Sequence, residues 1–295
     1  MGVQVSRSVC LLGMGAALAA SSLLGGCEKK TYPQDTPEAA IASARKMLED
    51  GKAEKLADLI YAENPDMRQT LVRVGRLLRD VQNLAASIQT KFPNDVAKIK
   101  EQAKSEGVTG LLSQIGGNQR RRGRAAADRD RDGAQFDGLI KQVMTDPYAW
   151  LQDNSGRLTT APVNDNLVAL LWDQKPILPP LGLGMRKDGD KWFLVLPTNL
   201  PGVSTFMPRS ADEYKTFSML FGILGNAIRD VDKDVKSGKL KTLDEVSRKV
   251  GENAFMPVAM FFIAYGKMIE SRPKAPAAET KAVERAPAEP KPAGG

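Results

Sequence analysis

Histidine is absent from the 295 residues, and cysteine occurs only twice, as Cys10 and Cys27. Without histidine the chain lacks the usual Ser-His-Asp and Cys-His catalytic groups and the histidine-rich sites of most zinc enzymes. Carboxylates, lysine, tyrosine and serine remain as acids, bases or nucleophiles, but no catalytic motif joins them. We therefore expect a protein that is not an enzyme, with a carboxylate-based hydrolase as the remaining enzymatic alternative.

Both cysteines lie within the first 27 residues, around a segment without charge. Arg7 is the only charged side chain before residues 9–26, which are rich in leucine, alanine and glycine. A basic start, an apolar run and an end of small residues are typical of a secretory signal peptide. One arginine makes no twin-arginine motif, so the sequence predicts general secretion.

The apolar segment ends in four residues that resemble the lipobox of bacterial lipoproteins: Leu24-Gly25-Gly26-Cys27. The resemblance implies that signal peptide 1–26 is removed, that lipid is attached to the Cys27 sulfur and that the new terminus receives a fatty acid such as palmitate. Several acyl chains anchor a protein firmly in a membrane. The residue after the cysteine is Glu28, not aspartate, which in enteric-type bacteria implies the outer membrane. An ordinary secretory signal and an uncleaved anchor helix are the alternatives.

This resemblance places the chain in the bacterial cell envelope, facing the periplasm or the exterior. No free cysteine would then remain, and no cofactor is expected beyond the lipid on Cys27. The formal net charge is +7. Outside the cytoplasm a basic protein meets anionic head groups and acidic polymers, so we expect an anionic envelope polymer or an envelope protein as partner, and no nucleic acid.

Residues 27–35 predict a tether, and 36–270 predict a single folded domain. Thr36 and Pro37 suit the cap and first position of a helix that exits at Gly51. A second short helix is expected over 53–61.

Two stretches repeat apolar residues at alternating spacings of three and four, which predicts two long amphipathic helices. The first seam is Met67, Leu71, Val74, Leu78, Val81, Ala85, Ile88 and Phe92. The second seam is Tyr214, Phe217, Phe221, Leu224, Ile228, Val231 and Val235. A capping box, Ser210 with Glu213, precedes the second seam. We expect both helices to face a common core, with an intermolecular coiled coil as the alternative.

Strand patterns are confined to the middle of the chain. Residues 157–163 and 167–172 predict strands, with Pro162 at a sheet edge. Residues 183–196 predict a hairpin that turns near Asp188-Gly189. The fold class is therefore α+β and mainly helical, with long antiparallel helices packed with a small antiparallel sheet.

A capped helix from Thr242 leads into residues 253–266, which carry no charge. Fourteen residues are too few to cross a bilayer comfortably. The run predicts a buried core helix, with membrane or partner contact as the alternative. Residues 271–295 are rich in proline, alanine, lysine and glutamate, which predicts a disordered tail.

Residues 36–60 resemble the opening helices of nuclear transport factor 2-like lipoproteins, and 186–197 are similar to the late hairpin of that cone-shaped fold. The resemblance implies a pocket between sheet and helix. It favours an alternative function, a periplasmic carrier of a small ligand with its pocket under the 183–196 hairpin, near Trp172 and Trp192. The chain departs from that fold by more than 60 inserted residues and by added helices after the hairpin.

Two further motifs lie in a flexible loop predicted over 116–134. Asp128, Asp130 and Asp132, with Gly133, match the opening of a calcium loop, but Leu139 stands where a closing glutamate belongs. A mixed-charge loop is the alternative. Arg120, Arg121, Arg122 and Arg124 form a cluster suited to phosphate or carboxylate groups of an anionic partner, or to a solvated loop.

The first seam helix carries a second basic series: Arg68, Arg73, Arg76 and Arg79. Such a series is either a solvated face or a contact for an anionic partner. The sequence thus favours a lipid-anchored envelope protein that acts as a binding or structural module without catalysis.

Overall fold

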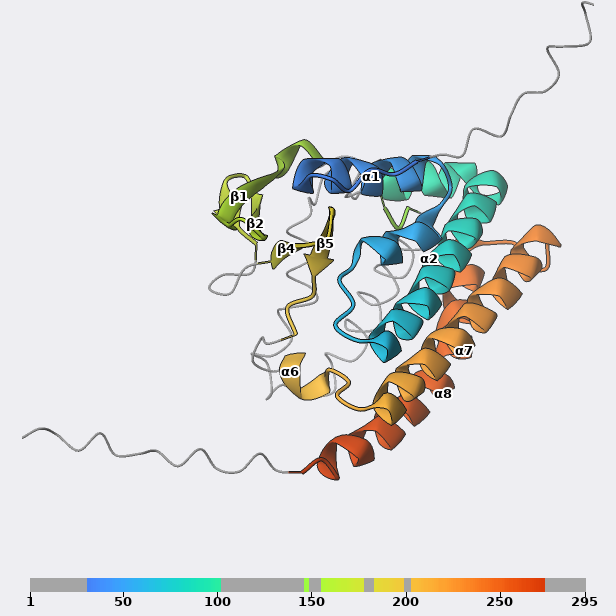
Figure 1. Ribbon diagram of the computed structural model, residues 1–295. Helices are drawn as coiled ribbons and strands as arrows, with labels where there is room; N and C mark the ends of the chain where they lie inside the picture. The colour runs from blue at the N-terminus through green and yellow to red at the C-terminus, as the bar shows by residue number, and fades with distance from the viewer. Residues whose placement is uncertain (1–30, 102–145, 149–154, 178–182, 199–202, 274–295) are drawn as a thin grey trace, which may run out of the picture.

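The computed structural model describes residues 31–101, 146–148, 155–177, 183–198 and 203–273. Within these residues α1 (Pro37–Glu49) covers a small antiparallel sheet, and long helices pack beside them (Figure 1). The predicted α+β, mainly helical fold is confirmed.

The N-terminal helices begin where the sequence predicts. The Thr36 hydroxyl accepts a hydrogen bond of 3.0 Å from the Ala39 backbone nitrogen, and this caps α1. A 3-10 helix, η1 (Ala53–Leu59), takes the place of the second short helix. The Asn64 side chain then caps α2 (Pro65–Lys91), which spans the first seam.

The sheet has the strand order β1-β2-β4-β5, with β3 beside β2. Its strands are β1 (Leu158–Asn164), β2 (Leu167–Trp172), β3 (Lys175–Pro176), β4 (Leu183–Asp188) and β5 (Lys191–Val195). Pro162 lies on edge strand β1, and Gly189, at φ +57°, turns the β4–β5 hairpin, as predicted. Ala40 of α1 packs on a buried apolar face made by Val168, Leu170, Met185 and Trp192.

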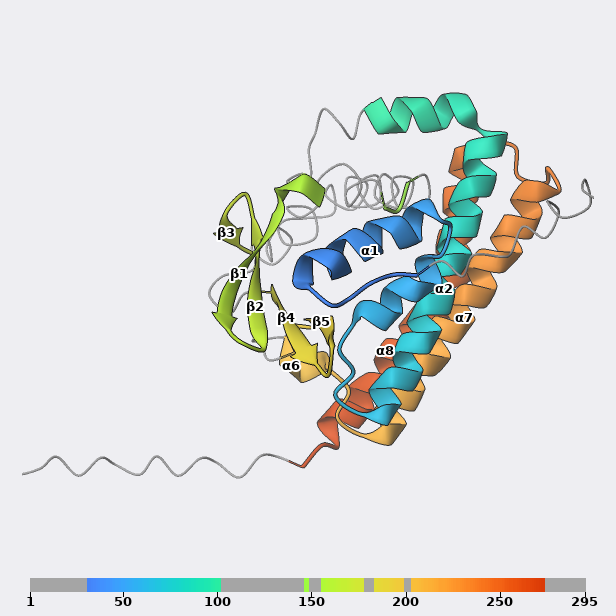
Figure 2. The same cartoon turned by 45° about the horizontal axis from the view of Figure 1, so that its top comes forward.

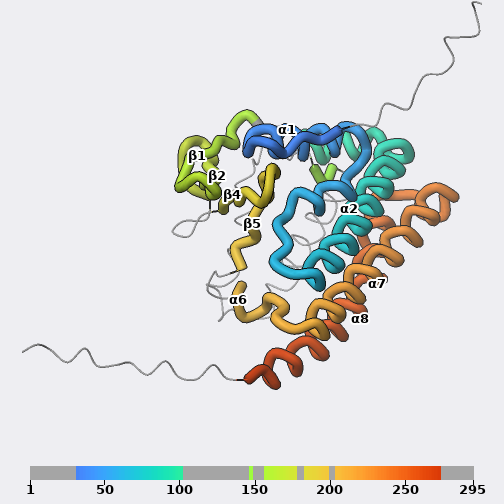
Figure 3. The backbone as a smooth tube through the Cα atoms, viewed as in Figure 1, coloured from blue at the N-terminus to red at the C-terminus, as the bar shows by residue number. Residues whose placement is uncertain are grey.

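Three helices form the second layer: α2, α7 (Ala211–Lys236) and α8 (Leu243–Glu270). Figures 2 and 3 show this layer in two views that differ by a 45° turn. The two seam helices α2 and α7 run parallel, which differs from the antiparallel order predicted for the long helices: Thr70 bonds Ser218 early in both helices, and Ser87 bonds Asp232 late in both. α8 returns antiparallel to α7, so that Thr216 near the start of α7 contacts Met268 near the end of α8.

The two seams pack against each other within one chain. Near their C-terminal ends Ile88 shares a core cluster with Ile228 and Val231, and near their N-terminal ends Leu71 shares one with Tyr214. The prediction of two amphipathic helices facing a common core is therefore confirmed. The short α6 (Val203–Phe206) precedes α7.

The uncharged run 253–266 does not form a buried core helix, so this prediction was wrong. It makes up much of the second half of α8, where Tyr265 is buried but Phe255, Phe262 and Ile263 are more than half exposed. Only one side of α8 packs against α7, and no described residue covers the other side. Among the described residues, no helix has the length and apolar character needed to span a membrane.

Candidate functional site

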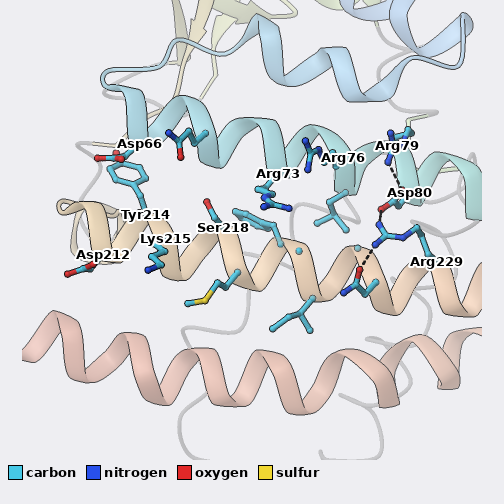
Figure 4. Close-up of a pocket in the computed structure, with 18 of the residues that line it drawn as sticks. Asp66, Arg73, Arg76, Arg79, Asp80, Asp212, Tyr214, Lys215, Ser218 and Arg229 are labelled. Atoms are coloured by element: carbon cyan, nitrogen blue, oxygen red, sulfur yellow. Dashed lines mark hydrogen bonds and ion pairs between the residues drawn. The ribbon is translucent and has the colours of Figure 1, made fainter.

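A groove of about 1140 Å³ runs between α2 and α7 (Figure 4). Its wall on α2 extends from Asp66 to Asp80, and its wall on α7 extends from Ala211 to Arg229. Because the two helices run parallel, residues near their starts lie at one end of the groove and Asp80 and Arg229 lie at the other.

Small residues on α7 leave the space that the groove occupies. Ser218, Gly222 and Gly225, each one residue after a seam position, line it with little side-chain volume. The Ser218 hydroxyl meets the Thr70 hydroxyl at 2.9 Å, which holds the helices together at the groove's inner side. Exposed Met219 and Ile223 add an apolar strip along its α7 edge.

The middle of the groove carries unpaired positive charge. Arg73 and Arg76 of α2 and Lys215 of α7 are exposed, and none has an ion-pair partner among the residues that the structure describes. Arg73 extends from α2 toward α7, where Ser218 and Lys215 lie (Figure 4). Guanidinium groups bind carboxylate and phosphate oxygens in paired hydrogen bonds, so these side chains are suited to an anionic group.

The far end of the groove is closed by a buried carboxylate. Asp80 is only 2% exposed and pairs with Arg229 and, at 3.4 Å, with Arg79. Arg229 also bonds the Asn226 side chain. A Cβ at Gly225 would lie 3.1 Å from Asp80 Oδ2, so glycine leaves room for this pair. Asp80 is therefore neutralised by Arg79 and Arg229, and it does not pair with Arg73 or Arg76.

Two other carboxylates lie at the opposite end. Asp66 and Asp212 each occupy the first turn of their helix, where a negative charge offsets the positive end of the helix dipole. The groove is thus mixed in charge at both ends and basic in its middle.

The basic series predicted on the first seam helix divides between two surfaces. Arg73, Arg76 and Arg79 line the groove, whereas Arg68 is not part of its lining. Arg79 is partly committed to Asp80, so Arg73 and Arg76 are the members available to an anion.

The other predicted site residues lie outside the described part of the chain. They are Cys27, the arginines Arg120, Arg121, Arg122 and Arg124, and the aspartates Asp128, Asp130 and Asp132. Among the residues described, no group of three or more acidic or cysteine side chains is placed to hold a metal ion.

Trp172 of β2 and Trp192 of β5 are not part of the groove lining. Trp192 is buried in the sheet core, and the Arg157 guanidinium lies 4.7 Å from the Trp172 ring centre. A second cavity, about 200 Å³ and lined by apolar residues, lies between α2, α7 and α8.

Sequence reasoning missed the α7 side of the groove. Lys215, Ser218 and Arg229 stand among the apolar residues of the second seam without forming a motif. The small residues Ser218, Gly222 and Gly225, at spacings of four and three, were the available signal. Compared with protein-family models, curated proteins and solved structures, the chain gave no match.

Proposed function

We propose that this protein is a lipid-anchored binding module of the bacterial cell envelope, without catalysis, whose α2–α7 groove holds an anionic group of an envelope component. The observation that carries the proposal is the pair Arg73 and Arg76, which are exposed in the groove and have no acidic partner among the described residues. The lipobox Leu24-Gly25-Gly26-Cys27 supports anchoring, with the outer membrane as the favoured site.

The geometry favours an extended anion over a small buried one. The groove is open along two helices, and its cations are spread over α2 and α7 rather than converging on one enclosed point. The apolar strip of Met219 and Ile223 beside the cations suits a partner with both anionic and apolar parts. Envelope polymers and lipid head groups that carry phosphate or carboxylate have this chemistry.

A binding titration with fluorescent lipopolysaccharide tests the groove. Removing both charges in the double variant Arg73→Ala, Arg76→Ala should weaken binding at least about tenfold, because charge-assisted hydrogen bonds are lost. The matched control, Arg68→Ala with Lys91→Ala, removes the same charge from α2 outside the groove lining. Equal losses in both double variants would reduce the effect to net charge and contradict a groove site.

A separate experiment tests the anchor. We expect native protein to incorporate labelled palmitate and to fractionate with membranes, and Cys27→Ser to do neither. A Cys27→Ser protein that stays membrane-bound, with native protein that takes no label, would contradict lipid anchoring while leaving the groove open to test.

A further inference from the structure

The second half of α8 presents an apolar face to solvent. Five of its large side chains are between 58 and 69% exposed: Phe255, Met256, Met260, Phe262 and Ile263. On the other side of the same helix, Phe261 and Tyr265 pack against Phe217 of α7. The helix therefore has one apolar side bound to α7 and a second apolar side uncovered among the described residues.

The exposed face has the size of half an interface. At about 200 Å² for each large side chain, the exposed fractions sum to about 600 Å². The small residues and charged ends beside it bring the face close to the roughly 800 Å² that each partner contributes to a stable complex. Patches of this size on soluble proteins mark interaction sites.

The charges that bound the face are arranged for self-recognition. Arg248, Lys249 and Glu252 stand at its N-terminal end, where Arg248 pairs with Glu252 at 3.8 Å, and Lys267 and Glu270 stand at its C-terminal end. Two copies of α8 in antiparallel order, related by an axis between residues 259 and 260, bring opposite charges level. Glu252 then meets Lys267 of the second copy, and Lys249 meets Glu270 of the second copy. Parallel pairing would instead set like charges side by side.

Side-chain sizes fit the same register. About that axis Phe255 is level with Ala264 of the second copy, and Ala259 is level with Met260 of the second copy. In these two pairs a large side chain faces a small one, which lets the helices approach closely, and Met256 lies level with Ile263 of the second copy, which adds an apolar contact.

A lipid surface fits the face less well. A helix that lies in the membrane interface has a polar side turned to water and basic residues along it. The other side of α8 packs on α7, and acidic Glu252 and Glu270 stand at the two ends of the exposed face. We infer that α8 is the interface of an antiparallel homodimer of this chain, a role beyond the proposed binding function.

Charge exchange tests both the interface and its register. Full-length processed protein in mild detergent is measured by sedimentation velocity over a range of concentrations. Glu252→Lys alone, or Lys267→Glu alone, should raise the dimer dissociation constant severalfold, because each places like charges together twice in the symmetric dimer. The double variant, Glu252→Lys with Lys267→Glu, should restore native affinity. Since Glu252 and Lys267 are exposed, these variants keep the monomer fold.

A second variant tests the apolar contact. Met256→Asp should leave only monomer, and the matched control Val72→Asp, which alters an exposed apolar residue on α2, should leave the dimer intact. Circular dichroism of both variants verifies folding, and the charge-exchange result stands if Met256→Asp fails to fold.

Three outcomes would overturn the proposal. The first is native protein that stays monomeric at every concentration. The second is a double charge variant that dimerises as weakly as the two single variants. The third is a monomer that binds anionic vesicles through Phe255 and Phe262. The last result would assign the face to a membrane. None of these outcomes depends on the groove.

Discussion

Arg272 ties the start of α7 to the end of α8. Its guanidinium donates two hydrogen bonds of 2.8 Å to the Glu213 carboxylate, and others to the backbone oxygens of Thr205 and Met207 and to the Tyr265 hydroxyl. Both ions are nearly buried, with 12% of the Arg272 side chain and 5% of the Glu213 side chain exposed. The hydrogen bonds from Arg272 lower the pKa of Glu213. The tail predicted from residue 271 therefore begins with residues that belong to the fold.

Replacing Arg272 should destabilise the protein strongly. Arg272→Ala leaves Glu213 buried without a cation, and removal of one partner from a buried pair costs about 3–5 kcal/mol. Urea unfolding of native and variant protein measures this loss. The control Arg248→Ala removes an arginine whose ion pair with Glu252 is long and exposed, and it should cost less than about 1 kcal/mol. Similar losses in the two variants would mean that the Arg272 contacts do not stabilise the fold.

The same pair should make stability depend on acid. Because the folded-state pKa of Glu213 is lowered, its contribution is fully present above the ordinary carboxyl pKa of about 4.3 and is lost as the pH falls through the lowered value. Native protein should therefore exceed Glu213→Gln in unfolding free energy at pH 7, and this difference should shrink as the pH falls below the ordinary carboxyl pKa. Unfolding curves between pH 2.5 and 7 measure the difference. A gap that stays constant with pH would exclude this linkage.

At the scale of the element, α7 meets two different demands. Its C-terminal half packs as a regular apolar seam, with Val231 and Val235 fully buried. Its middle is thinned by Gly222 and Gly225, which weaken a helix but open the groove. The two glycines differ in surroundings, because a Cβ at Gly222 meets nothing within 4 Å and one at Gly225 meets Asp80 and Arg229.

Alanine at these two positions should therefore act in opposite directions. Gly222→Ala should stabilise the protein by about 0.5–1 kcal/mol, the ordinary gain of alanine over glycine in a helix. Gly225→Ala should lose that gain and more, because its methyl group crowds the Asp80–Arg229 pair. Thermal unfolding of the two variants gives the comparison, in which each serves as the other's control. Equal stabilisation of the two variants would show that Asp80 and Arg229 shift away from the added methyl group without loss of stability.

Helix and strand positions followed from local chemistry, whereas the site did not. Thr36, Ser210 and Thr242 each cap a helix that the sequence predicts, because a cap depends on neighbours within one turn. The groove arises from parallel packing of helices whose contacting residues are about 145 positions apart. Apolar periodicity identifies the buried side of each helix, but it does not show whether the helix that packs there runs parallel or antiparallel. Arg73 could therefore be proposed as a contact for an anion, whereas Lys215 on the partner helix was missed.

Residues 253–266 show the same limit of prediction from local sequence. Their composition predicts burial correctly for the side that carries Phe261 and Tyr265. Composition does not show how many other helices pack against a segment. The helix α7 packs against one side of α8 and leaves the other side uncovered by described residues. The exposed apolar surface of α8 therefore follows from the packing of the helices in three dimensions and not from the composition of the segment.

At the scale of the whole molecule, the sheet and the helical layer share a boundary at η1. Ile60, at its end, bridges to Leu194 of β5, and both Ile60 and Leu196 pack on the cluster that contains Leu71 and Tyr214. The two layers therefore stabilise each other.

Unfolding should consequently be a single transition. Tryptophan fluorescence reports the sheet core through buried Trp192, and far-ultraviolet circular dichroism reports mainly the helices. The two probes should give the same midpoint in urea, as in cooperative unfolding. Ile60→Ala, which weakens the boundary, should lower that midpoint for both probes together. Midpoints that differ in native protein would show that the layers unfold separately.

The parallel arrangement of α2 and α7 also has a consequence in time. α2 is complete at residue 91, and η1 covers part of its apolar side, but the helix that covers Leu84 and Ile88 begins at residue 211. During synthesis or export, more than a hundred further residues must emerge before that side meets its partner. Pairing of segments so distant in sequence is slow compared with local helix formation. The newly made chain therefore passes through a stage in which a finished helix presents bare hydrocarbon to its surroundings, and the cell must protect it at that stage from aggregation and proteolysis.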